Sequence, residues 1–556
     1  MKHHVVKRLT CLLLACFLLM GLVPAAAHAT NLSGTCYASN LVSGEDIVLT
    51  GNTVLFMNTD LTLKSISGPY NLEIQGTGRL KVENPKGTAV EVANLTSSAP
   101  LVLTGAESAL LAESATLGSS VELYGGDAYY AAYAVSKFEF DGTRLEAEGG
   151  GGIQSASVSI NGSNVSVITD NGSAIAAYNG SVHVDSDQLF VQCTVRNTES
   201  GGLTGIEATE DITVISQDGT IAGYYGIRSD RGDISVSGNI WVGGGACAIH
   251  APEGAVELSG SITAQGGDNS YAIAAKDDLT FTGARLDAAG DFGITSNNGD
   301  VILNAEEVSV FGQVGAGVIA HQGSIDINSD TLFVQSAIAK GGALWENGIG
   351  AAKDITIESG NATIAGRQGV YSEAGDITLT GAFEIGALES ALFTQRGDIT
   401  VDGDLTASNA DEGYYCIVTT LGDILLTGGV FDITSQSNAL VAHEGNIYLD
   451  GDITAECAGT DSVAVDNRQG NIVIQSGPLD LTAGRYAIRT YNGLIQMEEG
   501  LSIRTPAGGR NDYNVIVDAS GNPASHVQID SMIESVSVWV NEPLAGAEPV
   551  TTAADV

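Results

Sequence analysis

Cations are scarce in this sequence of 556 residues. It contains 23 Lys and Arg against 66 Asp and Glu, which gives a formal net charge of −43. Because binding to a phosphate backbone depends on Lys and Arg, this balance excludes a nucleic-acid partner. Aromatic residues make up only 6% of the chain, too few for several separate globular cores, whereas a hydrophobic share of 44% excludes an acidic disordered tail.

Long apolar runs are confined to the first thirty residues. Three cations precede an apolar run from Leu9 to Val23, and small residues follow up to Ala29. This order predicts a cleaved secretory signal over residues 1–29, and hence a secreted or cell-surface protein. The run is shorter than the ~20 residues that a membrane-spanning helix needs, so no membrane span is expected. A membrane anchor and a lipidated Cys16 are the weaker alternatives.

Cysteine is also sparse, and five cysteines follow the predicted signal. An odd number without short spacings argues against a disulfide framework and against a zinc site. Stability is therefore expected to come from burial and backbone pairing. The five residues are Cys36, Cys193, Cys247, Cys416 and Cys457.

A short phrase of the form Gly-Asp-Ile-x-Val recurs through most of the chain. Its copies are separated by 22 to 30 residues, and most gaps lie between 22 and 25. A repeat of this length is typical of a solenoid. The first apolar residue of the phrase stands at Ile212, Ile234, Val256, Leu279, Val301, Ile325, Ile355, Ile377, Ile399, Ile424, Ile447, Ile472 and Ile495.

Each repeat contains three short segments in which β-branched residues alternate with polar ones. In one repeat these segments are Ile234–Val236, Ile240–Val242 and Cys247–Ile249. Three strands in about 22 residues are too closely spaced for the blades of a propeller, which need ~40 residues each. The pattern predicts an all-β fold, a right-handed parallel β-helix of about twenty coils with three strands per coil. The distribution of proline agrees with this fold, because proline cannot donate a hydrogen bond to a strand ladder and occurs between residues 101 and 505 only at Pro252 and Pro478.

A longer repeat and the return of proline divide the chain. The segment 181–192 is echoed at 324–335, an offset of 143 residues that indicates a duplicated block of six coils. Residues 30–100 are expected to form an N-terminal cap and the first coils, and residues 101–505 the parallel β-helix. Residues 506–535 are expected to form a C-terminal cap. Residues 536–556 look like the truncated start of a further, immunoglobulin-like module.

The sequence resembles bacterial surface proteins with a pectate-lyase-like, right-handed β-helix, in particular the carbohydrate-binding domain-containing proteins of Gram-positive gut bacteria. The segments Tyr70–Val82 and Gly87–Val90 and the Gly-Asp-Ile coils carry this resemblance. It covers most of residues 40 to 530 and implies the fold and binding of carbohydrate. Because it rests on glycines and aliphatic residues, it says little about activity.

Catalysis is not favoured by the residues present. Pectin hydrolases of this fold need several acidic and basic motifs on one face, and only Asn58-Thr-Asp60 is found here. Lyases need an Arg or Lys base beside calcium, and the cations of this chain are scarce and dispersed. We therefore expect no catalytic residues.

An acidic residue recurs at one position of four consecutive coils. Carboxylates stacked ~4.8 Å apart repel each other, and bound cations would relieve that repulsion. The alternative is that each Asp accepts a hydrogen bond from a turn amide, with water and salt screening the charges. The residues of this candidate calcium ladder are Asp354, Asp376, Asp398 and Asp423.

Exposed aromatic rings are the candidate ligand-binding residues, because a sugar stacks its C–H face on such a ring. Alternation places Trp241 outside. Tyr pairs precede the third strand of three coils, and their first members, Tyr129, Tyr224 and Tyr414, are expected at the corner. Tyr225 shares the parity of Ile227 and is expected to point inward. The alternative is an aromatic stack that only fills the bends.

Two long coils insert loops at matching places, from Cys193 to Leu203 and from Ser336 to Trp345. Loops on a rigid scaffold commonly carry function, so Trp345 joins the candidate ligand-binding residues. The sequence favours a non-catalytic, adhesin-like surface for a glycan or host-surface ligand, without a cofactor unless calcium binds. A passive surface stalk is the first alternative, and a polysaccharide lyase or hydrolase is the second. The oligomeric state is left open.

Overall fold

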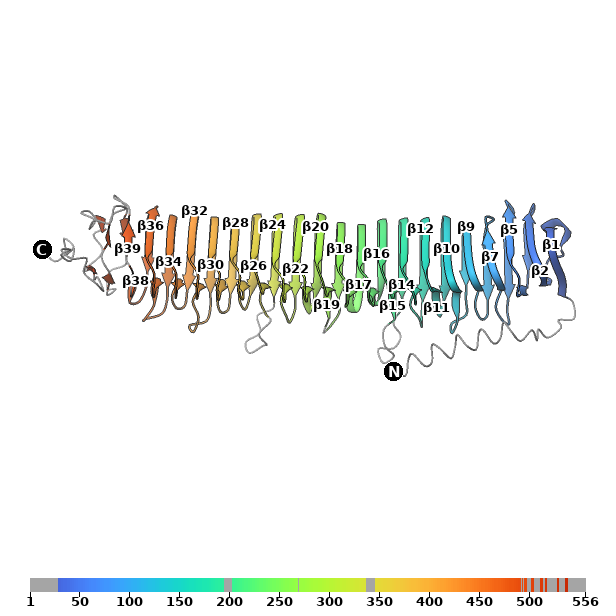
Figure 1. The fold of residues 1–556 in the computed structure, drawn as a ribbon, viewed down its shortest axis with the longest axis horizontal. Helices are drawn as coiled ribbons and strands as arrows, with labels where there is room; N and C mark the ends of the chain where they lie inside the picture. Colours follow the sequence, from blue (N-terminus) through green and yellow to red (C-terminus); the bar gives the residue numbers. More distant parts are fainter. Residues whose placement is uncertain are drawn as a thin grey trace. The chain divides into compact units, whose positions relative to one another are not determined.

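A computed structural model describes residues 29–194, 203–268, 270–336 and 346–491, together with 493, 495–497 and five short strands between 502 and 538. The predicted signal segment lies outside the described residues, apart from Ala29. The chain divides into two compact units, Met1–Asp230 and Arg231–Val556, which are described separately. Both units are parallel β-solenoids, as predicted, and together they contain about twenty coils (Figure 1).

The described residues of unit 1 form sixteen strands and one short 3-10 helix, and the strand pairs among them are parallel. The elements are β1 (Ala29–Tyr37), η1 (Ala38–Asn40), β2 (Asp46–Met57), β3 (Leu61–Leu63), β4 (Ser65–Gly68), β5 (Leu72–Gly76), β6 (Leu80–Asn84), β7 (Val90–Ser97), β8 (Leu101–Gly105), β9 (Leu110–Tyr124), β10 (Tyr130–Gly149), β11 (Gly151–Ser155), β12 (Val158–Thr169), β13 (Ile175–Ala177), β14 (Val182–Cys193), β15 (Thr204–Ala208) and β16 (Ile212–Ser229).

Unit 2 repeats the same arrangement. Its strands are β17 (Ile234–Ala251), β18 (Val256–Gly266), β19 (Tyr271–Ala275), β20 (Leu279–Gly290), β21 (Phe292–Ser296), β22 (Val301–Gly312), β23 (Val318–Ala320), β24 (Ile325–Ser336), β25 (Ile349–Ala351), β26 (Ile355–Gly366), β27 (Val370–Ser372), β28 (Ile377–Ala387), β29 (Leu392–Thr394), β30 (Ile399–Asn409), β31 (Ile417–Thr419), β32 (Ile424–Ser435), β33 (Leu440–Ala442), β34 (Ile447–Cys457), β35 (Val463–Asn467), β36 (Ile472–Ser476), β37 (Leu479–Thr482), β38 (Tyr486–Thr490), β39 (Ile495–Met497), β40 (Ser502–Arg504), β41 (Asn511–Tyr513), β42 (Ile516–Val517), β43 (Gln528–Ile529) and β44 (Val536–Val538).

The recurring Gly-Asp-Ile phrase sets the register of the coils. The apolar residue of each copy is the first residue of a strand, from Ile212 in β16 to Ile495 in β39. Within unit 2 these residues pair in register from coil to coil, for example Ile355 with Ile377 and Ile377 with Ile399. They are buried in every coil, so the repeat read from the sequence is the core of the solenoid.

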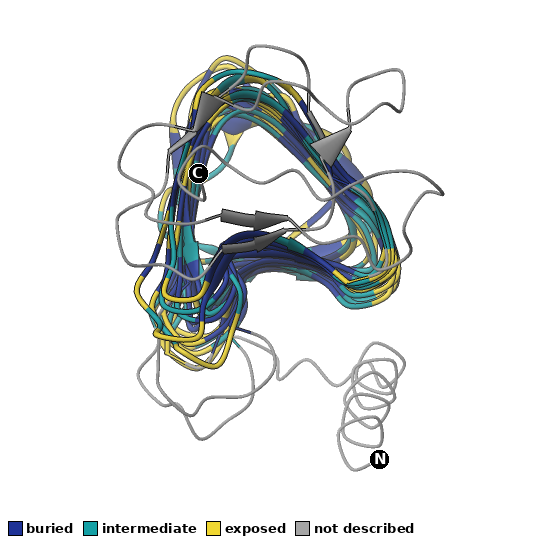
Figure 2. Ribbon diagram, turned by 90° about the vertical axis from the view of Figure 1, so that its left-hand side faces the viewer, coloured by how far each residue is buried: buried dark blue, intermediate teal, exposed yellow. Residues whose placement is uncertain are grey.

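A coil has three sides, which the strands β26 and β27 illustrate. Ile355 and Ile357 point into the core from the first side, and Ala362 and Ile364 from the second. Two consecutive exposed residues, 360 and 361, mark the bend between these sides, and β26 continues through it as one strand. The first two predicted strands are therefore joined. The third side is the short strand β27, and Figure 2 shows the three sides of unit 2 end-on.

The glycine of the Gly-Asp phrase is required by the close approach of successive coils. A Cβ atom on Gly397 would lie 2.0 Å from the carbonyl oxygen of Gly375 in the preceding coil. The inward hydroxyl of Thr394 also accepts a hydrogen bond from the Gly397 N–H at 3.0 Å. Glycine and an inward hydroxyl therefore close the turn between the third side of one coil and the first side of the next.

Parallel pairing continues beyond residue 505. Ile495 pairs with Ile516, Ile503 pairs with Ile529, and β41 pairs with β44. The division of residues 506–556 into a cap and a further module stays a prediction. In the described part of the chain, no helix has both the length and the apolar character to cross a membrane.

Candidate functional site

We call the outer surface of the third side the third face. Its central residue in each coil points outward, and in unit 2 these residues pair in register, as Val418 does with Val441 and Asp466 with Arg489. Val441 is nevertheless fully buried. The turns between the second and third sides project beside this face as a lobe, which is at the lower left of Figure 2. Side chains from the flanking turns therefore cover parts of it.

A charged pair lies on the third face near the end of unit 2. The guanidinium of Arg489 donates two hydrogen bonds to the carboxylate of Asp466, from Nε to Oδ1 at 2.8 Å and from Nη2 to Oδ2 at 2.6 Å. Oδ2 also accepts a hydrogen bond from Nδ2 of Asn438 at 3.1 Å. The Asp466 side chain is fully buried, so this pair is fixed in a single geometry.

Aromatic rings hold the Arg489 guanidinium from two directions. It lies 4.6 Å from the ring centre of Tyr491 and 5.3 Å from that of Tyr486. A second guanidinium, that of Arg485, lies 5.0 Å from the Tyr486 ring. Tyr486 is almost buried, whereas 46% of Tyr491 is exposed. Tyr491 therefore presents ring surface to solvent while Arg489 fixes its position.

Side chains from both edges of the third face meet in the coils around Val441. Nη2 of Arg468 donates a hydrogen bond to the Tyr415 hydroxyl at 3.2 Å, and the Tyr415 ring lies 6.2 Å from the ring of His443. Burial, and then the charge of Arg468, lower the pKa of His443, so its imidazole is neutral at pH 7. The residues that form the Arg–Tyr patch are Tyr415, His443, Asp466, Arg468, Arg485, Tyr486, Arg489 and Tyr491.

The Tyr residues predicted to bind ligand occupy one position of the coil. Tyr129 and Tyr414 lie in the turn that precedes the third side, whereas Tyr224 lies within β16 at the corresponding bend. Tyr129 and Tyr414 are exposed, and Tyr224 is half-buried. The hydrogen bond between Tyr414 and Glu389 and the negative charge of the Glu389 carboxylate raise the pKa of Tyr414. Nε of Arg367 donates a hydrogen bond to the same carboxylate at 2.7 Å. Tyr414 thus borders the Arg–Tyr patch, because Tyr415 is the next residue.

Trp241 is not on the third face. Trp241 points outward from the second side, as expected, between the buried Ile240 and Val242, and 37% of it is exposed. Its indole lies flat across Gly243, since a Cβ there would lie 2.3 Å from Cη2 of the ring. Trp241 therefore belongs to a different surface from the Tyr residues. Trp345 lies outside the described residues.

The expected inward orientation of Tyr225 is wrong. Its ring is half-buried and meets the ring of Tyr224 edge-on, with 5.3 Å between centres. The guanidinium of Arg228, an outward residue of the third side, lies 4.9 Å from the centre of the Tyr225 ring. Gly226 and Ile227 are both buried, so the alternation breaks at the corner and parity no longer predicts the side.

The four Asp residues of the candidate calcium ladder form a chain of hydrogen bonds between coils. Oδ1 of Asp354 accepts from the backbone N–H of Asp376, as Oδ1 of Asp376 does from Asp398. In the same way, Oδ1 of Asp398 accepts a hydrogen bond from the backbone N–H of Asp423, and Oδ1 of Asp423 accepts one from the backbone N–H of Asn446. This geometry matches the turn-amide alternative for one carboxylate oxygen. Calcium at the other oxygens stays a prediction, and among the residues with described positions no group of three or more His, Cys, Asp or Glu is arranged to hold a metal ion.

The one hydrolase-like motif found in the sequence, Asn58-Thr-Asp60, also makes hydrogen bonds between coils. Oδ1 of Asp60 accepts a hydrogen bond from the backbone N–H of Arg79 at 2.8 Å, and Nδ2 of Asn58 donates to the Ser39 hydroxyl at 3.1 Å. Both contacts join successive coils. The two side chains are thus engaged in the stacking of unit 1.

Sequence reasoning missed most of the Arg–Tyr patch. Two signals pointed to it. The order Tyr486-Ala-Ile-Arg489-Thr places Arg489 outward by alternation, and Arg468, Arg485 and Arg489 lie within 22 residues of a chain that is poor in cations. The contacts among the residues of the patch join side chains that lie one or two coils apart, and no local sequence pattern predicts such contacts.

Comparison with known proteins adds one match. A family model described as carbohydrate-binding domain-containing protein matches residues 386–542, less than half of the chain. That segment contains every residue of the Arg–Tyr patch as well as Tyr414. No curated protein and no solved structure matches the chain.

Proposed function

We propose that the protein binds a glycan through the Arg–Tyr patch, as a secreted or cell-surface protein. The observation that carries the proposal is the placement of Arg489, which is bonded to Asp466 and lies beside the rings of Tyr486 and Tyr491. Rigid rings next to fixed polar groups are what a sugar requires, because it has both C–H faces and hydroxyls. The local match to carbohydrate-binding proteins supports the same reading.

In this proposal each part of the patch has a separate role. The exposed ring of Tyr491 stacks on the C–H face of a sugar, and Arg468, Arg485 and the neutral His443 bond to its hydroxyls. Arg489 and Asp466 are positioning residues, because their hydrogen bonds to each other leave them little to offer a ligand. The patch is pre-organised, so little conformational entropy is lost on binding.

The proposed activity is binding without bond cleavage. Asp466 is the buried carboxylate of the patch, and both of its oxygens already accept hydrogen bonds from Arg489, with Asn438 as a further donor. A carboxylate held in this way is a poor general base. The proposal therefore assigns Asp466 to structure.

A glycan array tests the proposal and separates it from the stalk alternative. The wild-type protein should bind at least one glycan class, and Tyr491→Ala should lower that signal at least tenfold. Tyr70→Ala is the matched control, because Tyr70 is also an exposed Tyr but lies in unit 1. Absence of any signal would favour a stalk. A signal lost in Trp241→Ala but retained in Tyr491→Ala would move the site to the second side.

A further inference from the structure

We infer that unit 1 carries a second glycan site, selective for neutral sugars, on its own third face. It is formed by Tyr130, Tyr133, Gln154, Tyr178 and Glu207, outside the segment that matches the carbohydrate-binding family. This site goes beyond the function proposed for unit 2 and does not depend on it.

Three Tyr rings meet in this part of unit 1. The rings of Tyr130 and Tyr133 have centres 5.3 Å apart, and those of Tyr133 and Tyr178 have centres 6.2 Å apart with only 10° between their planes. The Tyr178 hydroxyl donates a hydrogen bond to the carbonyl oxygen of Val135, which fixes its ring. All three rings are half-buried, so each keeps part of its surface open to solvent.

This grouping is not a by-product of coil stacking. In unit 2, Tyr271 pairs in register with Phe292, and their rings stack because the backbones are adjacent. Tyr133 instead pairs with Gln154, and Gln154 pairs with Ala176 in the coil that carries Tyr178. The Tyr133 and Tyr178 rings therefore meet across an intervening coil.

The intervening coil is shaped to receive a ring. A Cβ atom on Gly151 would lie 2.5 Å from Cδ1 of Tyr130, so the Tyr130 ring rests on the glycine backbone. Any larger residue at this position would displace the ring. Gly151 thus acts as a positioning residue for the aromatic surface.

Polar groups that suit sugar hydroxyls lie in the same row of the third face. Gln154 pairs with Tyr133 of the preceding coil, and Glu207 pairs with the small Ala176 of the coil that precedes its own. The Glu207 carboxylate accepts a hydrogen bond from the Ser173 hydroxyl at 2.8 Å, which orients it. An amide and an oriented carboxylate beside aromatic rings can accept from and donate to several hydroxyls.

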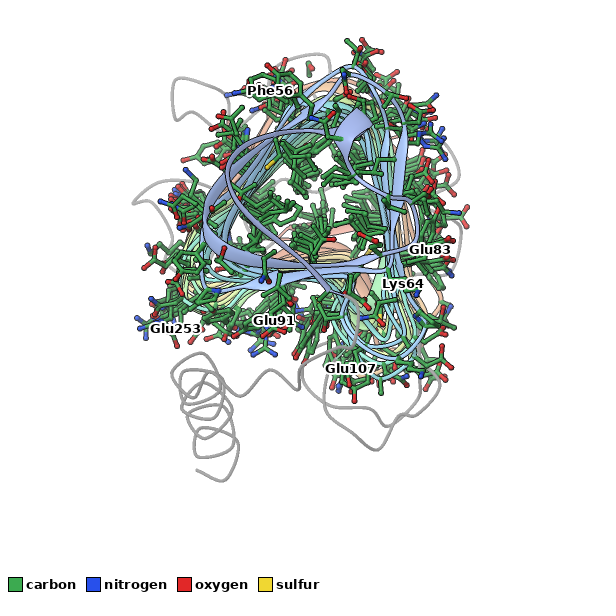
Figure 3. The ribbon with its side chains drawn as sticks, turned by 90° about the vertical axis from the view of Figure 1, so that its right-hand side faces the viewer. Phe56, Lys64, Glu83, Glu91, Glu107 and Glu253 are labelled. Carbon is green, nitrogen blue, oxygen red and sulfur yellow. The ribbon has the colours of Figure 1, made fainter. Side chains whose placement is uncertain are left out.

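The charge around the rings favours a neutral sugar over an acidic one. The five site residues include one acid and no cation. Arg228, the next residue in the row, is paired with Asp230 at 2.9 Å and lies over Tyr225. Figure 3 shows the other end of the row, where Glu91 points out from the third side of unit 1 near the lobe that carries Glu107. Glu207 within the site and Glu91 on one flank would repel a sugar carboxylate, whereas Arg228 on the other flank is already paired with Asp230 and leaves no net positive charge there to attract it.

Binding of the full chain to immobilised neutral and acidic polysaccharides tests this inference. The probes are a galactan, a glucan and a mannan, with polygalacturonate as the acidic counterpart. Measured in a Tyr491→Ala background, one neutral polymer should still bind. Adding Tyr133→Ala or Gln154→Ala should then weaken that binding at least tenfold, whereas adding Tyr70→Ala should not change it.

Three results would overturn the second site. They are loss of all neutral binding in the Tyr491→Ala background, neutral binding that survives both Tyr133→Ala and Gln154→Ala, and stronger binding of polygalacturonate than of every neutral polymer. Gln154→Ala guards against a folding defect, because it leaves the three rings in place. If Tyr491→Ala has no effect while Tyr133→Ala does, the unit 1 site stands and the function proposed for unit 2 fails.

Discussion

Oδ1 of Asp376 accepts a hydrogen bond from the backbone N–H of Asp398, one coil further on, at 2.8 Å. The same contact recurs along the ladder, and in the last coils Asn takes the place of Asp. Oδ1 of Asn446 accepts from the N–H of Asn471 at 3.0 Å. An amide oxygen therefore serves this position as well as a carboxylate does.

The first prediction concerns Asp376. Asp376→Asn should leave the free energy of unfolding unchanged or slightly raised, because the hydrogen bond stays and repulsion between stacked carboxylates falls. Asp376→Ala should lower it by about 1 kcal/mol, because the Asp398 amide loses its acceptor. Chemical denaturation of both variants measures this. Equal losses in the two variants would show that the charge, and not the acceptor, is what matters.

The same variants address calcium. A calcium ladder predicts that calcium at fixed ionic strength raises the melting temperature of the wild-type protein, and that replacing all four Asp residues by Asn abolishes the rise. If the ladder only joins coils, calcium leaves both melting temperatures unchanged. Magnesium at the same concentration is the control for ionic effects.

The second prediction concerns Glu91 on the third face of unit 1. Burial, with a smaller contribution from Glu107, raises the pKa of Glu91 above its usual value. Stability is therefore lost as the pH rises from about 4.5 through the raised pKa, since the native state holds the proton more tightly. Glu91→Gln should be more stable than wild type at pH 7, by about 0.5 kcal/mol or less because the site is partly exposed. The difference should vanish at pH 4, and a constant difference would contradict the assignment.

The repeat in the sequence was sufficient to predict the fold, and the site was only partly predictable. The Gly-Asp-Ile phrase specifies contacts that are the same in every coil, so Ile355 and Ile377 could be placed in register without a structure. The outward orientation of Trp241 followed from strict alternation on the second side.

Corners and contacts between coils were harder to predict. Two-residue alternation fails where Gly226 and Ile227 are both buried, and the orientation of Tyr225 was wrong for that reason. The approach of His443 to Tyr415 joins opposite edges of the third face in neighbouring coils. Such contacts depend on side-chain length and direction, which the spacing of residues along the chain does not specify.

The third prediction concerns the charged pair of the Arg–Tyr patch. Arg489→Leu alone should destabilise the last coils by about 3 kcal/mol, because it leaves the buried Asp466 carboxylate without its cation. Asp466→Val combined with Arg489→Leu should restore most of this loss, since Val418 and Val441 occupy the same row in earlier coils. Hydrogen exchange of β35 and β38 measures both effects. Equal protection in the single and double variants would contradict this account of the pair.

The fourth prediction concerns the cysteines. Burial raises the pKa of Cys247 and of Cys457 to about 12, so neither forms a thiolate at pH 8. Cys193 and Cys416 are also buried, whereas Cys36 is partly exposed. Iodoacetamide should therefore label Cys36 in the native protein and all five residues only in denaturant, as peptide mass spectrometry would show. Native labelling of Cys457 at the rate of Cys36 would indicate that the last coils open readily.

Calorimetric titration of the best glycan from the array tests the central claim most directly. It compares wild type with the Asp466→Val, Arg489→Leu double variant. The account predicts that the double variant stays folded but binds at least tenfold more weakly, because the Tyr491 ring loses the guanidinium that positions it. Equal affinity in a folded double variant would show that the Arg–Tyr patch is not the glycan site.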